Sequence, residues 1–182
     1  MKATQCLNAL LFLLVAGIGS QIVLAVSRAQ QVAPPPAPAT GLVVGDTLPA
    51  LTGSLEGNVP TTIPLARDAG IATVLYVFHP DCVHSHAVAP DWALHFSADH
   101  TDSPMVQRIA VTNDAVMPAE AYAERFGWNV DVLSMRDLTP TDREFSLFSR
   151  TPWVFVFDSA GVLRFDGHGR RLGQMIQAIE AL

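Results

Sequence analysis

An uninterrupted apolar run stands near the middle of the chain, at residues 71–78 (IATVLYVF). It is rich in β-branched and aromatic residues and carries no charge, which is typical of a strand buried on both faces at the centre of an α/β sheet. The run ends at residues 79–81 (HPD), which predict a turn, and a segment able to form a helix begins at Val83. The pattern therefore predicts a strand, a turn and a helix, with Cys82 where the turn meets the helix.

The polar and apolar pattern of the rest of the chain predicts alternating helices and strands. In chain order we expect a hairpin over 51–65, the strand over 71–78, a helix from 83 to about 98, a strand over 106–111, a helix over 117–126, a short strand over 130–135, a helix over 139–148, a hairpin of strands over 153–157 and 162–165, and an amphipathic helix over 171–182. This order predicts an α/β sandwich with a mixed central sheet flanked by helices, preceded by an N-terminal hairpin extension.

The N-terminal segment is predicted to lead the chain out of the cytoplasm. Residues 3–27 carry no charge, and a helix of that length, rising about 1.5 Å per residue, spans the ~30 Å hydrocarbon core of a bilayer. We favour a retained signal anchor over residues 1–28, placing the protein in the bacterial inner membrane as a single-pass protein with its domain facing the periplasm. The alternative is a cleaved signal peptide and release into the periplasm. Residues 29–41, rich in proline and alanine, predict an extended linker, and residues 42–182 predict the folded domain.

Charge and cysteine content narrow the classes of function. The net charge is −6, and the acidic and basic residues are interspersed without a basic stripe, so we expect no nucleic-acid partner. The two cysteines, Cys6 and Cys82, lie on opposite sides of the apolar N-terminal segment, so we expect no disulfide between them.

Cys82 is the candidate nucleophile. Its predicted position, after a central strand and at the first turn of a helix, offers unpaired backbone N–H groups and the positive end of the helix dipole. Both favour the thiolate over the thiol, and the thiolate is the reactive form of cysteine.

This region resembles the active-site region of the thioredoxin superfamily, whose pattern is a strand, C-x-x-C, and a helix with a proline five residues after the second cysteine. Cys82 matches the first cysteine and Pro90 has the expected spacing, but Ser85 stands at the second cysteine position. The Thr151-Pro152 pair matches the cis-proline that precedes an antiparallel strand beside the family's active site. The entry segment GLVVGDTLPAL further resembles the membrane-anchored redoxin and TlpA-like branch.

The resemblance implies thiol-disulfide exchange without a second active-site thiol. Mixed disulfides formed by Cys82 would be resolved by another thiol, with His84 and Ser85 stabilising the thiolate, and the partner would be a protein thiol or disulfide client. We expect residues beside the cysteine to bind that client: His79, Pro80, Thr151, Pro152 and Trp153. No cofactor is expected.

Other interpretations of the same residues stay open. The fold could serve as a redox-inactive binding module with Cys82 as a packing residue. A metal-handling protein would use the histidines around Cys82, at positions 79, 84 and 86, with His168 as a distant ligand, although we expect no metal site. A 1-Cys peroxidase is disfavoured because peroxiredoxins place Thr or Ser where this chain has His79.

Overall fold

The computed structural model describes residues 41–67, 70–97 and 106–182. The predicted signal segment, residues 1–28, and the linker up to residue 40 lie outside the described residues. No helix within the described ranges has the length and apolar character needed to cross a bilayer. The elements are β1 (Ala50–Leu55), η1 (Glu56–Asn58), β2 (Val59–Pro64), β3 (Ala72–Val77), α2 (Val83–Ser97), β4 (Val106–Thr112), α3 (Val116–Phe126), β5 (Asp131–Ser134), η2 (Arg143–Ser149), β6 (Trp153–Phe157), β7 (Leu163–His168) and α4 (Leu172–Glu180).

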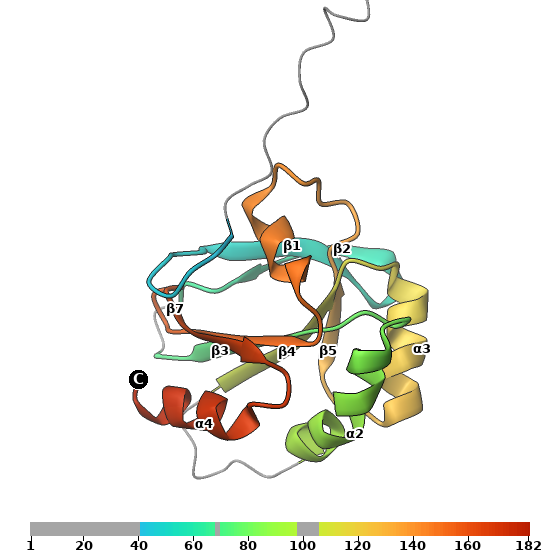
Figure 1. Ribbon diagram of the computed structural model, residues 1–182. Coiled ribbons are helices and arrows are strands. Elements are labelled where there is room, and N and C mark those ends of the chain that lie inside the picture. Colours follow the sequence, from blue (N-terminus) through green and yellow to red (C-terminus); the bar gives the residue numbers. More distant parts are fainter. Residues whose placement is uncertain (1–40, 68–69, 98–105) are drawn as a thin grey trace, which may run out of the picture. The chain divides into compact units, whose positions relative to one another are not determined.

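The strands form one mixed seven-stranded sheet in the order β2-β1-β5-β4-β3-β6-β7 (Figure 1). β3 runs parallel to β4 and antiparallel to β6, and each of its residues is buried. The predicted α/β sandwich with a mixed sheet and a doubly buried central strand is therefore confirmed.

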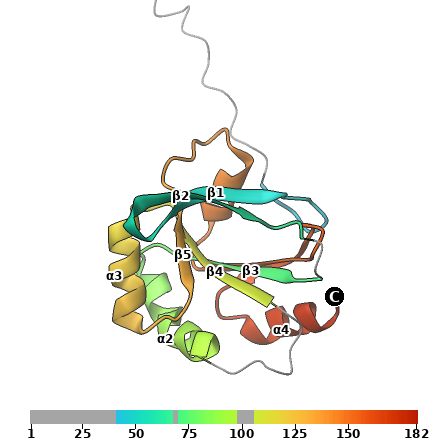
Figure 2. The ribbon, with the colours of Figure 1, turned by 180° about the vertical axis from the view of Figure 1, so that it is seen from behind.

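Alternate residues of β3 point into two separate hydrophobic cores. Val74, Tyr76 and Phe78 pack with side chains of α2, α3 and α4. Leu75 and Val77 pack on the opposite face, with residues of β1, β2 and η2. The ribbon seen from both sides shows the helices along one face of the sheet and the β1–β2 hairpin with η2 over the other (Figures 1 and 2).

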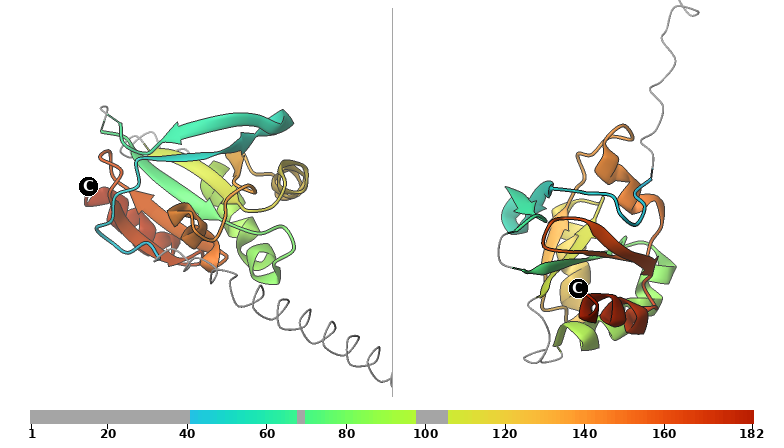
Figure 3. Two further views of the ribbon diagram at one scale, coloured as in Figure 1. Left: turned by 90° about the horizontal axis from the view of Figure 1, so that it is seen from above. Right: turned by 90° about the vertical axis from the view of Figure 1, so that its left-hand side faces the viewer.

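The predicted N-terminal hairpin is present as β1 and β2, and it is joined to the rest of the sheet at one point. β1 pairs with β5 through Ser54 and Ser134 alone. The approach is close at Gly53, where a Cβ atom would lie 2.3 Å from the carbonyl oxygen of Ser134. Because only a residue without a side chain fits there, the hairpin can cross β5 and fold over the sheet (Figure 3).

The predicted helix over 139–148 is wrong. The segment instead contains the 3₁₀ helix η2, which begins at Arg143. The Asp142 carboxylate accepts hydrogen bonds from the backbone N–H of Thr139, at 2.6 Å, and from its hydroxyl, at 2.8 Å. These local bonds hold a turn and compete with helical pairing at the place where the sequence pattern predicted the helix to begin. The returning strand β7 is also longer than predicted, ending at His168.

Candidate functional site

Cys82 lies in the turn between β3 and α2, directly before the first residue of α2, as predicted. Its backbone N–H donates to the carbonyl of His79 at 3.0 Å, and its own carbonyl accepts the N–H of His86 at 3.1 Å. The first bond closes the turn after the strand, and the second opens the helix. The Cys82 side chain is half-buried and unpaired, so its sulfur stands at the helix entrance with access to solvent.

The surroundings of the sulfur favour its ionised form. Partial burial raises the pKa of the Cys82 thiol, but hydrogen bonds from the backbone N–H groups of Ser85 and His84 lower it, and together with the side chains named next they hold it below its ordinary value of 9.0. The side chains of Thr151 and Ser85 lower it further. His84 thus acts on the sulfur through its backbone, while its side chain is exposed.

Ser85 has a buried hydroxyl at the position where the C-x-x-C pattern has its second cysteine. Its side chain is 1% exposed, and its Oγ accepts the backbone N–H of His79 at 3.2 Å. The hydroxyl proton remains free to point at the Cys82 thiolate. Ser85 therefore ties the turn before the cysteine to the helix after it, and it also contributes to the lowered pKa of Cys82.

The predicted cis bond between Thr151 and Pro152 is confirmed, and it lies beside the cysteine. Cys82 Sγ is 3.9 Å from the carbonyl oxygen of Thr151, a long hydrogen bond that the thiol can donate. That carbonyl accepts only from the neutral thiol, whereas the Thr151 hydroxyl favours the thiolate.

Gly169 links Pro152 to Trp92 through two hydrogen bonds. Its backbone N–H donates to the Pro152 carbonyl at 3.1 Å, and its carbonyl accepts the indole N–H of Trp92 at 2.9 Å. A Cβ atom at Gly169 would lie 2.6 Å from the Trp92 ring and 3.2 Å from Pro152. The sequence analysis did not single out this residue, because nothing local to positions 167–169 indicates that Trp92 comes to rest there.

The remaining predicted client-binding residues gather at the same edge of the sheet. Pro80 is buried, while His79 and Trp153 are half-buried. The Arg150 guanidinium lies 4.2 Å from the centre of the Trp153 ring, and the His168 ring lies 6.1 Å from it. His84 lies near enough for its charge to lower the pKa of His168, although burial of His168 is the larger cause. The fold thus brings His168 to the side of the site.

Tyr122 belongs to the site and was missed by the sequence analysis. Its side chain is 5% exposed, and its hydroxyl has no hydrogen-bond partner among the described residues. Burial and the negative charge of the Cys82 thiolate both raise the pKa of Tyr122, so the phenol stays protonated at neutral pH. Tyr122 sits in a segment correctly predicted as helical, but the sequence offers nothing that orients it toward the sulfur.

The residues that could hold a metal ion differ from those considered from the sequence. In the described part of the chain, His79, Asp81 and Asp114 are the group whose ligand atoms lie within 4.8 Å of one another. His86 instead directs its ring Nε2 at the carbonyl of Pro80. Of the histidines considered for a metal-handling protein, His79 alone belongs to this group. His79 and Asp114 follow β3 and β4, which are parallel neighbours, and this explains why they meet.

Comparisons with known proteins identify the fold. No protein-family model matches the chain, and no curated protein matches it by sequence. Among solved structures, a peroxiredoxin-like protein from Aquifex aeolicus is similar, with 14% identity, a TM-score of 0.61, and coverage of 79% of this chain and 89% of that one. The C-terminal domain of a putative thiol-disulfide oxidoreductase from Bacteroides thetaiotaomicron has 11% identity and a TM-score of 0.61, covering 77% and 98%. The thioredoxin domain of a thiol-disulfide oxidoreductase from Bacteroides vulgatus has 13% identity and a TM-score of 0.59, covering 75% and 99%.

The described domain thus has a thioredoxin-like fold. At these identities the likeness establishes the fold alone. The chemistry has to be argued from the residues around Cys82.

Proposed function

We propose that the protein carries out thiol-disulfide exchange through Cys82 as its single active-site thiol. This proposal rests on the position of Cys82 at the start of α2, beside the Thr151 carbonyl, where hydrogen bonds from Ser85, His84 and Thr151 together lower its pKa although partial burial raises it. A cysteine kept only for packing has no need of such donors, and burial alone would raise its pKa. The redox proteins among the structural neighbours are consistent with this chemistry.

The exchange proceeds in two balanced steps. The Cys82 thiolate attacks one sulfur of a client disulfide, a bond forms between the two sulfurs, and the other client sulfur leaves as a thiolate. A second thiolate, from the client or from a small thiol, then attacks the mixed disulfide and releases Cys82 as a thiolate. No electrons are gained or lost by the protein overall, so the net reaction is transfer or rearrangement of a disulfide.

Ser85 gives this chemistry its monothiol character. A cysteine at this position would attack the mixed disulfide from within the protein, but a hydroxyl is not a leaving or attacking group for sulfur at neutral pH. The mixed disulfide therefore persists until an outside thiol arrives. We infer that the client lies along His79, Pro80, Thr151, Pro152 and Trp153, the mostly apolar surroundings of the sulfur.

We further propose that the protein works outside the cytoplasm, anchored in the inner membrane by residues 1–28 and facing a periplasmic client. The uncharged stretch over residues 3–27 supports this proposal. Cell fractionation together with protease accessibility of a C-terminal tag in spheroplasts tests it. A tag that is protected in spheroplasts, or a chain found in the cytosolic fraction, contradicts the proposed location.

The exchange itself is tested in the full chain with Cys6→Ser, so that Cys82 is the one thiol present. Incubation with a peptide disulfide should give a mixed disulfide, seen as a mass increase that glutathione removes. Cys82→Ser should abolish the adduct, and Ser85→Cys should clear it without added thiol. If clients co-purify with the Cys82→Ser chain as well as with the parent chain under non-reducing conditions, capture is non-covalent and the protein is a binding module.

A further inference from the structure

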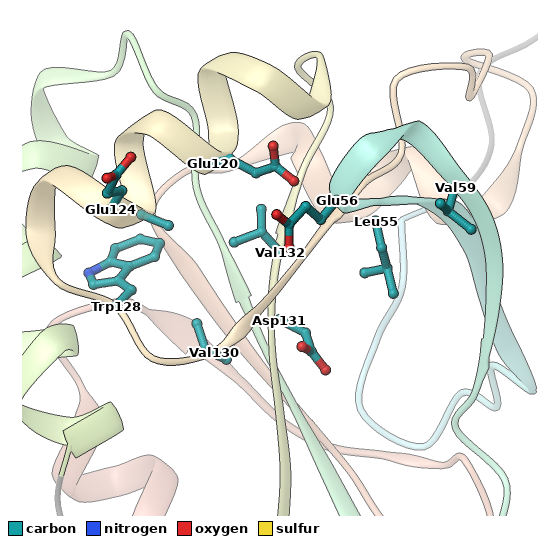
Figure 4. A pocket seen from close by; sticks show the side chains of 10 residues that line it. Leu55, Glu56, Val59, Glu120, Glu124, Trp128, Val130, Asp131 and Val132 are labelled. Atoms are coloured by element: carbon teal, nitrogen blue, oxygen red, sulfur yellow. The ribbon is translucent and has the colours of Figure 1, made fainter.

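A groove of about 760 Å³ lies between α3, η1 and β5, and Cys82 is not among the residues that line it (Figure 4). Its lining includes the carboxylates of Glu56, Glu120, Glu124 and Asp131 and no basic side chain. Glu120 and Glu124 lie on one face of α3. Tyr122 lies on another face, where its ring contacts His86 at a centroid distance of 5.3 Å and its phenol is affected by the charge of Cys82. The groove is therefore a second surface, which the exchange mechanism does not use.

No ion pair in the described part of the chain involves a carboxylate of the groove. The ion pairs seen there join Arg143 to Asp46, Arg150 to Asp166 and Arg164 to Asp158, so none reaches a groove carboxylate.

One of these carboxylates is partly withdrawn from water. Glu120 Oε1 is buried and has no hydrogen-bond partner among the described residues. Figure 4 shows the Glu56 and Glu120 side chains turned toward each other. A cation placed beside Glu120 Oε1 would supply the partner that this buried oxygen lacks.

Apolar side chains share the lining with the carboxylates. Leu55, Val59, Trp128 and Val132 all contribute, and Val59 is 56% exposed. A small inorganic cation would leave this apolar surface in water. A ligand carrying both positive charge and apolar groups would cover it.

The edge of β5 adds backbone groups to the groove. The N–H of Met135 donates to Thr112 of β4 at 2.8 Å. Because successive residues of a strand point their backbone groups to opposite sides, those of Ser134 and Val132 point toward β1. Ser134 pairs with Ser54, but the pairing ends there. Val132, which lines the groove, is thus left without a strand partner on that side.

We propose that this groove binds an extended, basic segment of a partner protein, which would pair with the part of β5 that β1 leaves unpaired beyond Ser134. Alternating side chains of an extended segment would place apolar groups on Val132 and Trp128 and cations against Glu56, Glu120 and Glu124. A neighbouring hollow of about 410 Å³ shares Trp128, Val130 and Asp131 but also contains Arg108. The uniformly acidic stretch, and with it the site for the basic segment, therefore ends at Asp131. The inference is independent of the reaction at Cys82.

The test uses a short fluorescent peptide in which lysine and valine alternate, titrated with the full chain and followed by anisotropy. The matched variants are the double change Glu120→Gln and Glu124→Gln, in the groove, and the double change Asp137→Asn and Glu180→Gln, on exposed residues outside it. Both remove the same net charge. The groove variant should bind about tenfold more weakly than the parent chain, and the control should bind like the parent.

Two further probes separate the proposed occupant from simple charge attraction. A peptide with N-methylated backbone amides keeps its charge but cannot pair with a strand edge, so it should bind more weakly. Spermidine carries charge without apolar groups, so it should compete poorly. Equal loss in both double variants, equal binding of the N-methylated peptide, or full competition by spermidine at the peptide's own concentration would each overturn the proposal.

Discussion

The Cys82 site and the acidic groove lie on different faces of α3, and their electrostatic characters are opposite. Around Cys82, backbone N–H groups and hydroxyls converge on one sulfur and lower its pKa. In the groove, carboxylates converge on one space without a basic group. The Cys82 site stabilises the negative charge of its own thiolate. The groove presents carboxylates to which a positively charged partner can bind. One fold thus offers a reactive centre and, separately, a docking surface.

The two regions also differ in how they are built. The backbone donors to Cys82 come from His84 and Ser85, which closely follow it in the chain, and Thr151 adds a contact from a distant segment. The groove combines η1, α3 and β5, and it exists because β1 leaves β5 after one residue pair. Changes that act on one region should therefore leave the other intact.

The largest effect is expected from Gly53→Ala, which should alter the groove and leave the reactivity of Cys82 unchanged. In Gly53→Ala the new Cβ atom would lie 2.3 Å from the Ser134 carbonyl oxygen, so β1 has to move off β5. We expect the free energy of unfolding to fall by about 1–3 kcal/mol, as for other overpacked sites, and binding of the lysine-valine peptide to change. Denaturant unfolding and anisotropy measure both. Gly41→Ala, whose Cβ meets nothing within 4 Å, is the control. Slower alkylation of Cys82 in Gly53→Ala would contradict the separation.

The converse change acts on the cysteine site. In Gly169→Ala the added methyl group presses on Trp92 and Pro152, so Pro152 is displaced from its position beside Cys82. We expect a loss of about 1–2 kcal/mol of stability and slower formation of the mixed disulfide, with unchanged binding of the basic peptide. The control is Gly173→Ala, which has open space and lies within α4, so it should be neutral or stabilise by up to about 1 kcal/mol. Unaltered exchange kinetics in Gly169→Ala would show that Pro152 does not position the reaction.

A smaller effect is expected from Ser85→Ala. The change removes a hydroxyl that lowers the pKa of Cys82 and leaves the His79 N–H without its acceptor. The pKa of Cys82 should rise, alkylation at pH 7 should slow, and stability should fall by about 1 kcal/mol. Ser97→Ala, which removes an exposed hydroxyl on the same helix, should change none of these. Faster alkylation in Ser85→Ala would mean that the hydroxyl opposes the thiolate.

The smallest effect is the dependence of stability on pH. Because the pKa of Cys82 is lowered in the folded state, the unfolded chain binds more protons between that pKa and 9.0. The stability due to Cys82 is fully present above 9.0 and is lost as the pH falls through the folded-state pKa. The difference in unfolding free energy between the Cys6→Ser chain and the same chain with Cys82→Ser, measured in reductant, should therefore increase with pH across this window. A difference that is constant or decreases with pH contradicts the lowered pKa.

Local patterns predicted most of the fold because local causes produce it. The unbroken apolar run gave the central strand. Gly127, expected to stop the helix before it, adopts a left-handed conformation with φ of 67° at the end of α3. The helix expected over 139–148 failed because Asp142 binds back to Thr139, a contact that periodicity does not register.

The residues of the Cys82 site likewise fall into those that the sequence could predict and those that it could not. Cys82, Ser85 and the Thr151-Pro152 bond could be predicted because sequence neighbours or a known resemblance mark them. Tyr122 and Gly169 could not, because each reaches the site through packing with residues distant in the chain. The acidic groove has no counterpart in any run of consecutive residues.

The most direct test is the rate of Cys82 alkylation by iodoacetamide as a function of pH in the full Cys6→Ser chain. Only the thiolate reacts, so the midpoint of the curve reports the pKa of Cys82. The account predicts a midpoint below 9.0. A midpoint at 9.0 or above would contradict it, because burial would then outweigh the backbone donors of α2 and Cys82 would not be an activated thiol.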